Sequence, residues 1–163
     1  MIWTVLAASA LASATPATPP VPSTTCPPAA AFPIDIRVTQ VVRVRTGANG
    51  ESMFEAATLE ASGHDYFHPG QTFFSIDFGA ASKVQLVQSP PNVTFPWHPS
   101  PGYEAFLTIA GSSFVLLRDG SERELTPGTL VIMEDMESTT GHGGRTGPCG
   151  SVTIQIVATT PIL

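Results

Sequence analysis

The chain carries little charge, and little of that charge is positive. Only 12% of its 163 residues are charged, and seven Lys and Arg stand against thirteen Asp and Glu, which gives a net charge of −6. Proteins that bind nucleic acid need clustered basic residues to contact the phosphate backbone. We therefore expect no nucleic-acid partner.

Several motifs of common enzyme classes are also missing. The chain has no GxSxG elbow and no phosphate-binding Gly-Lys-Ser/Thr loop, and its two cysteines do not form a CxxC pair. These absences argue against an α/β-hydrolase, a P-loop nucleotide-binding protein and a zinc ribbon. The length suits one domain with a short appendage, which excludes a two-domain enzyme.

Long uninterrupted helical segments are lacking too. Sixteen Pro and fourteen Gly interrupt the chain, and these residues favour turns and short strands over long helices. An all-helical bundle is therefore excluded.

The N-terminal segment has the pattern of a secretory signal peptide. Residues 2–14 are apolar or small and end in Ala12-Ser13-Ala14, which places small residues at the −3 and −1 positions of a cleavage site after Ala14. The apolar run is too short to cross a bilayer of about 30 Å as a helix. We predict a signal peptide over 1–14, a secreted protein and no membrane anchor. An uncleaved Ala-rich tail is the alternative, because a basic n-region is missing.

A Pro-, Thr- and Ala-rich leader follows over residues 15–33, and its composition cannot build a core. In a secreted protein, Cys26 in this leader and Cys149 late in the chain can form a disulfide, with two free thiols as the alternative. Asn92 begins the sequence Asn-Val-Thr, an N-glycosylation site. The remaining residues, 34–163, are predicted to form the folded domain.

Alternating apolar and polar residues predict about seven short strands in this domain. Turn signals at Ala110-Gly111, Asp119-Gly120 and Pro127-Gly128 separate several of them. Spacing of this kind predicts an all-β sandwich or barrel. Only residues 52–61 could be helical. The predicted strands cover residues 38–45, 74–78, 83–88, 105–110, 113–118, 129–133 and 152–157.

The order of motifs after residue 96 resembles the cupin superfamily. His98 and Glu104 precede an apolar strand that ends at Gly111, with six residues between Glu104 and Gly111, as in the first cupin motif. Gly120 and Pro127-Gly128 are similar to the start of the second motif. The resemblance covers residues 84–145, a little over a third of the chain.

The chain also resembles a group of small single-domain cupins. The matching features are segments 49–55, 98–104 and 134–143, which begin at Asn49, His98 and Glu134. The resemblance implies a single jelly-roll β-barrel with short loops and little helix. That fold carries dioxygenases, decarboxylases, isomerases, sugar epimerases and non-catalytic binding proteins, so it does not select a reaction.

The typical cupin metal site has two His in an HxH pair, a Glu and a further His. Here Ser100 stands where the second His of the pair is expected, and His142 comes later than the usual last ligand. The resemblance implies His98, Glu104 and His142 as ligands of a divalent ion such as iron, manganese or zinc, a set of imidazole and carboxylate groups that suits these ions. A lost site is the alternative.

The same residues can act without a metal. His98 and Glu104 at a barrel mouth can serve as general base and acid, because burial shifts their pKa values toward neutrality. Each also has a structural interpretation: His98 caps a loop, Glu104 pairs with Arg118 or Arg123, and His142 is an exposed turn residue. His64 and His68 are interpreted as loop surface. The predicted walls for a small ligand are the aromatic residues Trp97, Tyr103, Phe106 and Phe114.

Two functions remain open from the sequence. The first is a secreted small cupin that binds a small organic molecule and acts as an acid–base or metal-assisted isomerase, cyclase or oxygenase. The second is a non-catalytic extracellular binding or structural protein on the same scaffold. The small molecule is the expected partner in both, and a homodimer is compatible with either.

Overall fold

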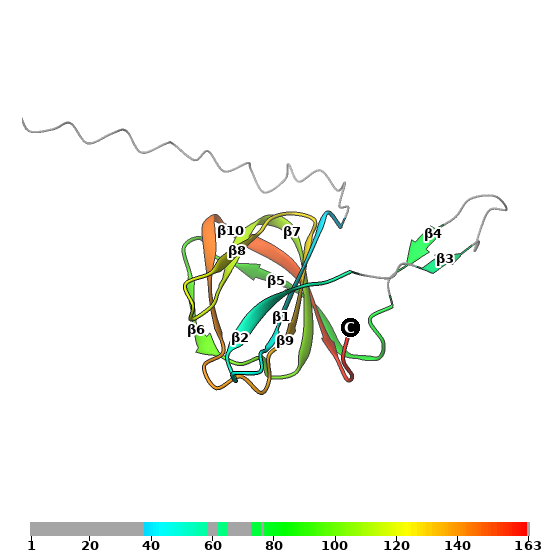
Figure 1. Cartoon of the computed structure of the whole chain (residues 1–163). Coiled ribbons are helices and arrows are strands. Elements are labelled where there is room, and N and C mark those ends of the chain that lie inside the picture. Colours follow the sequence, from blue (N-terminus) through cyan, green and yellow to red (C-terminus); the bar gives the residue numbers. More distant parts are fainter. Residues whose placement is uncertain (1–37, 59–61, 65–72, 76, 163) are drawn as a thin grey trace, which may run out of the picture.

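The computed structural model describes residues 38–58, 62–64, 73–75 and 77–162 (Figure 1). The signal peptide over 1–14, the leader over 15–33 and Cys26 lie outside the described residues, so the proposals about them stay predictions. The described part of the chain is all-β and contains no helix. The predicted fold class is confirmed at this level.

The described residues contain ten strands, and the two longest strands lie in the second half of the chain. They are β1 (Gln40–Thr46), β2 (Ser52–Ala56), β3 (Ser62–His64), β4 (Phe73–Ser75), β5 (Ala81–Ser89), β6 (Thr94–His98), β7 (Tyr103–Leu116), β8 (Glu122–Leu125), β9 (Thr129–Glu134) and β10 (His142–Ala158).

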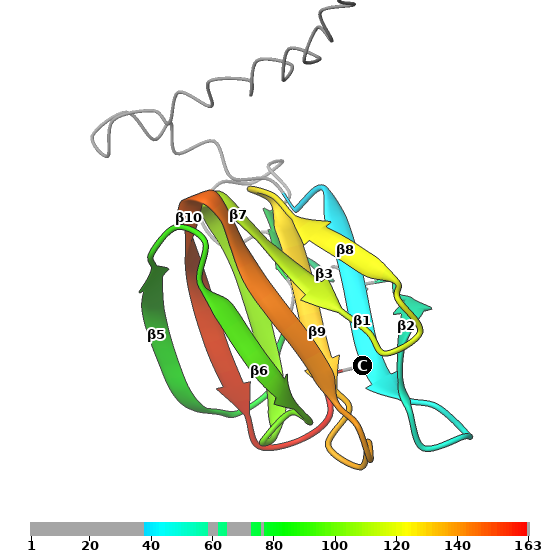
Figure 2. The ribbon, with the colours of Figure 1, turned by 90° about the vertical axis from the view of Figure 1, so that its left-hand side faces the viewer.

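Eight of the ten strands form one mixed sheet that does not close within the described residues (Figure 2). Its order is β2-β1-β9-β7-β10-β5, with β8 added to the end of β7 and β6 added to the beginning of β10. β1 and β9 are parallel, and the other pairs are antiparallel. β3 and β4 pair with each other in a separate two-stranded sheet.

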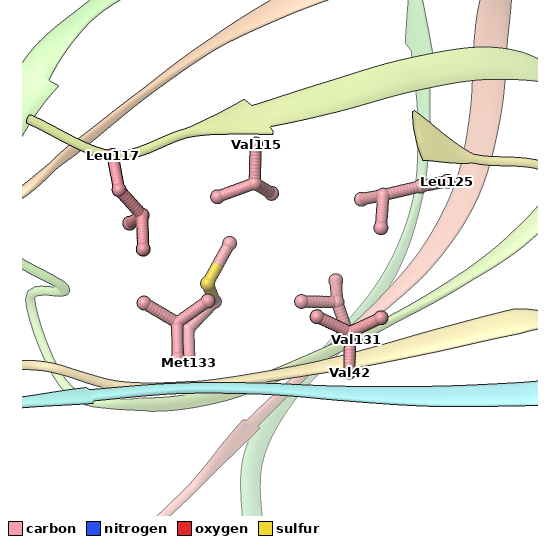
Figure 3. Packing of buried hydrophobic residues seen from close by; sticks show 7 residues of the cluster. Val42, Val115, Leu117, Leu125, Val131 and Met133 are labelled. Carbon is pink, nitrogen blue, oxygen red and sulfur yellow. The ribbon is translucent and has the colours of Figure 1, made fainter. Parts of the chain in front are cut away.

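The sheet curves until its two halves face each other across an apolar core. Figure 3 shows side chains from the end of β7, from Leu117 and from β8 pointing toward side chains of β1 and β9. This burial of aliphatic groups is the main stabilising contribution. The cluster consists of Val42, Val44, Val115, Leu117, Leu125, Val131 and Met133.

A second apolar cluster lies on the opposite face of the same strands. Leu130 and Ile132 belong to it, whereas their β9 neighbours Val131 and Met133 belong to the first cluster. Successive residues of a strand point to opposite faces, so β9 is buried on both sides. Burial on both faces explains why the sequence of β9 is continuously apolar rather than alternating.

Some predicted turns and strands are confirmed, and others are corrected. The Asp119-Gly120 hairpin joins β7 to β8, and Pro127-Gly128 joins β8 to β9. Ala110-Gly111 is not a turn, because β7 runs through it. Gly111 has φ of 67°, and a Cβ there would lie 2.1 Å from the Gly150 carbonyl oxygen. A close approach between β7 and β10, rather than a chain reversal, requires this glycine.

The segment that could be helical forms a strand over Ser52–Ala56, where it pairs with β1. The sequence did not predict β6, because two prolines flank and interrupt it, or the first half of β10, because that half is rich in glycine. Within the described residues, no helix has the length and apolar character needed to span a bilayer.

Candidate functional site

A cavity of about 270 Å³ lies on the concave side of the sheet, beside the first apolar cluster. It is bounded by residues of β5, β6, β7 and β10, with contributions from β8 and β9. The three residues predicted as metal ligands all line it: His98, Glu104 and His142. The structure therefore brings together the side chains that the sequence placed in one barrel opening.

His98 and His142 are neighbours because β6 pairs with β10. The two residues are directly opposite each other in the antiparallel register, and their ring centroids lie 4.8 Å apart. His142 is buried, whereas His98 is exposed, so His98 lies where the cavity meets solvent. The interpretation of His142 as an exposed turn residue is wrong.

A β-bulge in β6 turns both Phe95 and His98 toward the cavity. Between two register pairs, β6 advances three residues, from Phe95 to His98, while β10 advances two, from Gly144 back to His142. Residues three apart in a regular strand face opposite sides, but one extra residue restores the same side. Both side chains consequently line the cavity.

The tight contact between β6 and the chain before β10 depends on Gly141. Its φ is 65°, and a Cβ would lie 2.1 Å from the carbonyl carbon of His98. No side chain other than hydrogen fits there. Gly141 thus holds the His98 backbone beside β10.

A buried carboxylate, Asp135, fixes the orientation of His142. The Nδ1 atom of His142 donates to Asp135 Oδ2 at 2.8 Å, and the hydroxyls of Ser52 and Ser100 donate to the same carboxylate at 2.5 and 2.6 Å. Burial alone would raise the pKa of Asp135, but the hydrogen bonds from His142, Ser100 and Ser52 outweigh it and lower the pKa to about 2. Asp135 is therefore ionised beside His142.

Ser100 and Asp135 are the functional residues that the sequence analysis missed. Ser100 stands at the position where a cupin has a second histidine ligand, and its hydroxyl and backbone N–H both donate to Asp135. The two residues are 35 positions apart, so no local sequence pattern indicates that they contact each other. Asp135 belongs to segment 134–143 of the cupin resemblance, which assigned it no role.

Each histidine presents its Nε2 atom without a protein partner among the described residues. The Nδ1 atom of His98 lies 2.8 Å from the carbonyl oxygen of Pro96. A carbonyl oxygen only accepts, so Nδ1 carries the hydrogen; His142 Nδ1 donates to Asp135 in the same way. In the neutral ring, Nε2 is consequently an acceptor at both residues.

Glu104 is buried at the start of β7 and is held by a chain of amides. Gln155 Nε2 donates to Glu104 Oε1 at 2.8 Å, and Gln85 Nε2 donates to Gln155 Oε1. The predicted pairing with Arg118 or Arg123 is wrong: Arg118 stacks on Trp97 and Arg123 on Phe54.

Burial raises the pKa of Glu104, although the Gln155 hydrogen bond and the nearby histidines act in the opposite direction. Its second carboxyl oxygen, Oε2, has no protein partner within the described residues. Glu104 therefore offers one oxygen atom for a ligand or for proton transfer.

Of the four aromatic residues predicted to bind a ligand, two line the cavity. Phe106 and Phe114 belong to its walls, whereas Trp97 and Tyr103 do not. Trp97 instead packs over Gly143, where a Cβ would lie 3.0 Å from its ring, and Arg118 stacks on it at 3.9 Å. Strand alternation in β7 accounts for Phe106, which is two residues from Glu104.

The donor set suits a divalent ion in chemical type but not in spacing. Two imidazoles and one carboxylate are common ligands of iron and zinc, and Nδ1 bonds to oxygen acceptors are the usual support of metal-binding histidines. In the described part of the chain, however, no three His, Cys, Asp or Glu side chains lie close enough to hold an ion. His98, Glu104 and His142 share a cavity without forming a coordination site.

The remaining predicted residues lie away from the cavity. Asn92 is exposed in the turn between β5 and β6, with φ of 57°, and its glycosylation stays a prediction. Cys149 is partly buried in β10; its bond to Cys26, which lies outside the described residues, also stays a prediction. His64 ends β3, and His68 lies outside the described residues.

Comparisons with known proteins do not identify a family. No family model matches the chain, and no curated protein is significantly similar to it. A crystal structure of protein NMB1881 from Neisseria meningitidis is similar at 13% identity and a TM-score of 0.36, over 61% of this chain and 84% of that chain.

Proposed function

We propose that this protein binds a small organic molecule in the cavity and catalyses a proton transfer on it, as an isomerase or cyclase does. One observation carries the proposal: His98, Glu104 and His142 line one largely apolar cavity, and each has an atom without a protein partner there. Pockets with apolar walls and a few polar groups are typical of ligand sites.

The residues have distinct roles in this reaction. His142 Nε2 is the principal base, because the ionised Asp135 orients its ring and stabilises the imidazolium that forms after it accepts a proton. His98 is a second base at the solvent-exposed end of the cavity. Glu104, with its raised pKa, is the acid that returns a proton to the substrate.

Deuterium exchange tests binding and chemistry together. Fragments that bind are identified by saturation-transfer NMR and then incubated with the protein in D2O. We expect a carbon-bound hydrogen of a binding fragment to exchange with the wild type, and the exchange rate to fall at least about 100-fold in His142→Gln and Glu104→Gln, a typical general acid–base contribution. The exposed β8 substitution Glu124→Gln is the control and should leave the rate unchanged.

The alternative is a non-catalytic extracellular binding protein, and the same experiment separates the two. Binding that is weakened by the His142 and Glu104 substitutions, with no exchange in any fragment, would favour the binding protein. Binding that is equal in all variants would place the ligand outside the cavity and contradict both functions.

A metal-assisted activity, including oxygenation, is the second candidate. The Nδ1 bonds of His98 and His142 to oxygen acceptors favour it, because such bonds support metal ligands. Metal analysis of the purified protein and of His98→Ala tests it. A stoichiometric metal that is lost in His98→Ala would favour this candidate, and equal trace metal in both would contradict it.

The cupin jelly roll and the secreted location belong to the same proposal. The curvature of the sheet and the positions of Gly111, Gly120 and Gly128 at a bulge and two turns support a cupin-type barrel. The signal-peptide pattern over 1–14 supports secretion, and secretion in turn supports the Cys26–Cys149 disulfide and a glycan on Asn92.

A further inference from the structure

The charge of the cavity lining restricts which ligands it can take. Among the described residues that line it, none is Lys or Arg, and one, Glu104, is acidic. A phosphate or carboxylate moved into such a site would lose its water without gaining a positive partner, which is costly. The lining therefore disfavours anions.

The arginines around the cavity do not change this conclusion. Arg145 stacks on the cavity residue Phe114 at 3.5 Å, but its guanidinium pairs with Glu122 at 2.8 Å and does not line the cavity. Arg118 is occupied by its contact with Trp97. Neither offers a charge to a ligand inside.

The titratable side chains of the lining present free acceptor atoms to a ligand. Nε2 of His98 and Nε2 of His142 accept because each Nδ1 carries the ring hydrogen, and the unpaired oxygen of Glu104 accepts when ionised. Buried acceptors without a donor are unfavourable. A ligand that brings N–H or O–H groups would satisfy them.

Most of the remaining side chains of the lining are apolar or small, and the apolar ones would contact the body of the ligand. Phe106, Phe114, Val115, Leu125, Val131 and Met133 contribute to it. Aromatic and aliphatic walls of this kind favour a compact hydrocarbon or ring over a chain of polar groups.

From these observations we infer that the natural ligand is a non-anionic molecule with at least two O–H or N–H donors on a compact apolar body, and that the cavity rejects phosphorylated and carboxylated compounds. This inference rests on the proposed function and names the substrate class of the same site.

Four benzene derivatives of similar size test the inference by calorimetric titration in the presence of EDTA, which removes metal-dependent binding. Catechol carries two neutral donors, benzylamine carries cationic donors, 1,2-dimethoxybenzene carries none, and phenyl phosphate is an anion. We expect catechol or benzylamine to bind at least tenfold more tightly than the other two, since one hydrogen bond is worth about a factor of ten.

A gain-of-function variant provides a second readout. Gln85 lines the cavity from β5, whereas Gln88, three residues later, is exposed. Gln85→Arg should introduce binding of phenyl phosphate, and Gln88→Arg, the matched control with the same charge, should not.

The outcomes separate the inference from the function on which it rests. Wild-type binding of phenyl phosphate or 1,2-dimethoxybenzene as tight as that of catechol and benzylamine would overturn the inference alone. Failure of all four probes to bind would contradict the proposed function and the inference together.

Discussion

Asp135 and Glu104 are two buried carboxylates near the same histidines, and the fold gives them opposite proton affinities. Asp135 accepts hydrogen bonds from four donors, which lower its pKa, whereas Glu104 accepts one hydrogen bond and has its pKa raised by burial. Pairs of acidic groups with separated pKa values are common where one must stay charged and the other must exchange protons.

Glu104→Gln should increase the thermal stability of the protein at neutral pH. Because folding raises the pKa of Glu104, its protonation favours the folded state, and that contribution disappears as the pH rises through the unfolded and then the folded pKa. At pH 7 Glu104 is ionised in the unfolded chain, so folding must either bury that charge or take up a proton, and glutamine requires neither. The melting temperatures of the two proteins should converge below about pH 4. A lower melting temperature for Glu104→Gln at pH 7 would contradict a functional, destabilising carboxylate.

Asp135→Asn should have the opposite effect. The pKa of Asp135 falls from 3.8 to about 2 on folding, which corresponds to about 2 kcal/mol of stability. This contribution is complete above the unfolded pKa and is lost as the pH falls through the folded pKa. Urea denaturation at pH 7 should show the loss in Asp135→Asn but not in Glu137→Gln, an exposed substitution in the same loop. Equal stability of the two variants would argue against the network around Asp135.

At the level of elements, the site depends on irregularities within strands. Regular alternation holds at the start of β7: Glu104 and Phe106 line the cavity, while Ala105 and Leu107 lie in the second apolar cluster. Farther along β7, the consecutive residues Ser113, Phe114 and Val115 all line the cavity, so simple alternation does not hold there. Register shifts between β7 and β10 interrupt the regular pairing before this point, and alternation in a single sequence cannot reveal them.

Gly141→Ala tests whether the close contact between β6 and β10 positions His98. The new Cβ would lie 2.1 Å from the His98 carbonyl carbon, so β6 must move, and we expect a loss of at least about 2 kcal/mol together with weaker fragment binding. Gly120→Ala is the matched control: its φ is 85°, but no atom lies within 4 Å of a Cβ there. Equal losses in urea denaturation would show that backbone strain alone, and not the contact with His98, determines the effect.

For the whole molecule, composition and periodicity were sufficient to predict an all-β domain, because proline and glycine exclude long helices and β9 and the β7–β8 hairpin have strong local signals. The sequence could not predict how the sheet curves, since that depends on pairing between residues far apart, such as β1 with β9. The prediction that His98, Glu104 and His142 lie close together rested on the cupin resemblance. Asp135 lies in segment 134–143 of that resemblance, but the resemblance assigned it no role, and its contacts are visible only in three dimensions.

The secreted form of the protein should begin at Thr15. Intact-mass measurement of the secreted product tests this expectation, and retention of Met1 would contradict secretion through a cleaved signal.

The secreted protein should also contain a disulfide bond between Cys26 and Cys149. Peptide mapping without reduction tests this bond. A bond between these cysteines closes a loop of about 120 residues and contributes nominally about 4 to 5 kcal/mol. Two free thiols would contradict the bond.

The state of the two histidine rings is the most direct test of the site. Long-range 1H–15N correlation spectra at about pH 8.5, where imidazoles are normally neutral, identify which ring nitrogen carries the hydrogen, with His98→Gln and His142→Gln assigning the signals. We expect hydrogen on Nδ1 and a bare Nε2 in both rings, and a change in both Nε2 shifts when a binding fragment is added. Hydrogen on Nε2 in either ring, or shifts that do not respond to a bound fragment, would contradict a cavity that presents these atoms to its ligand.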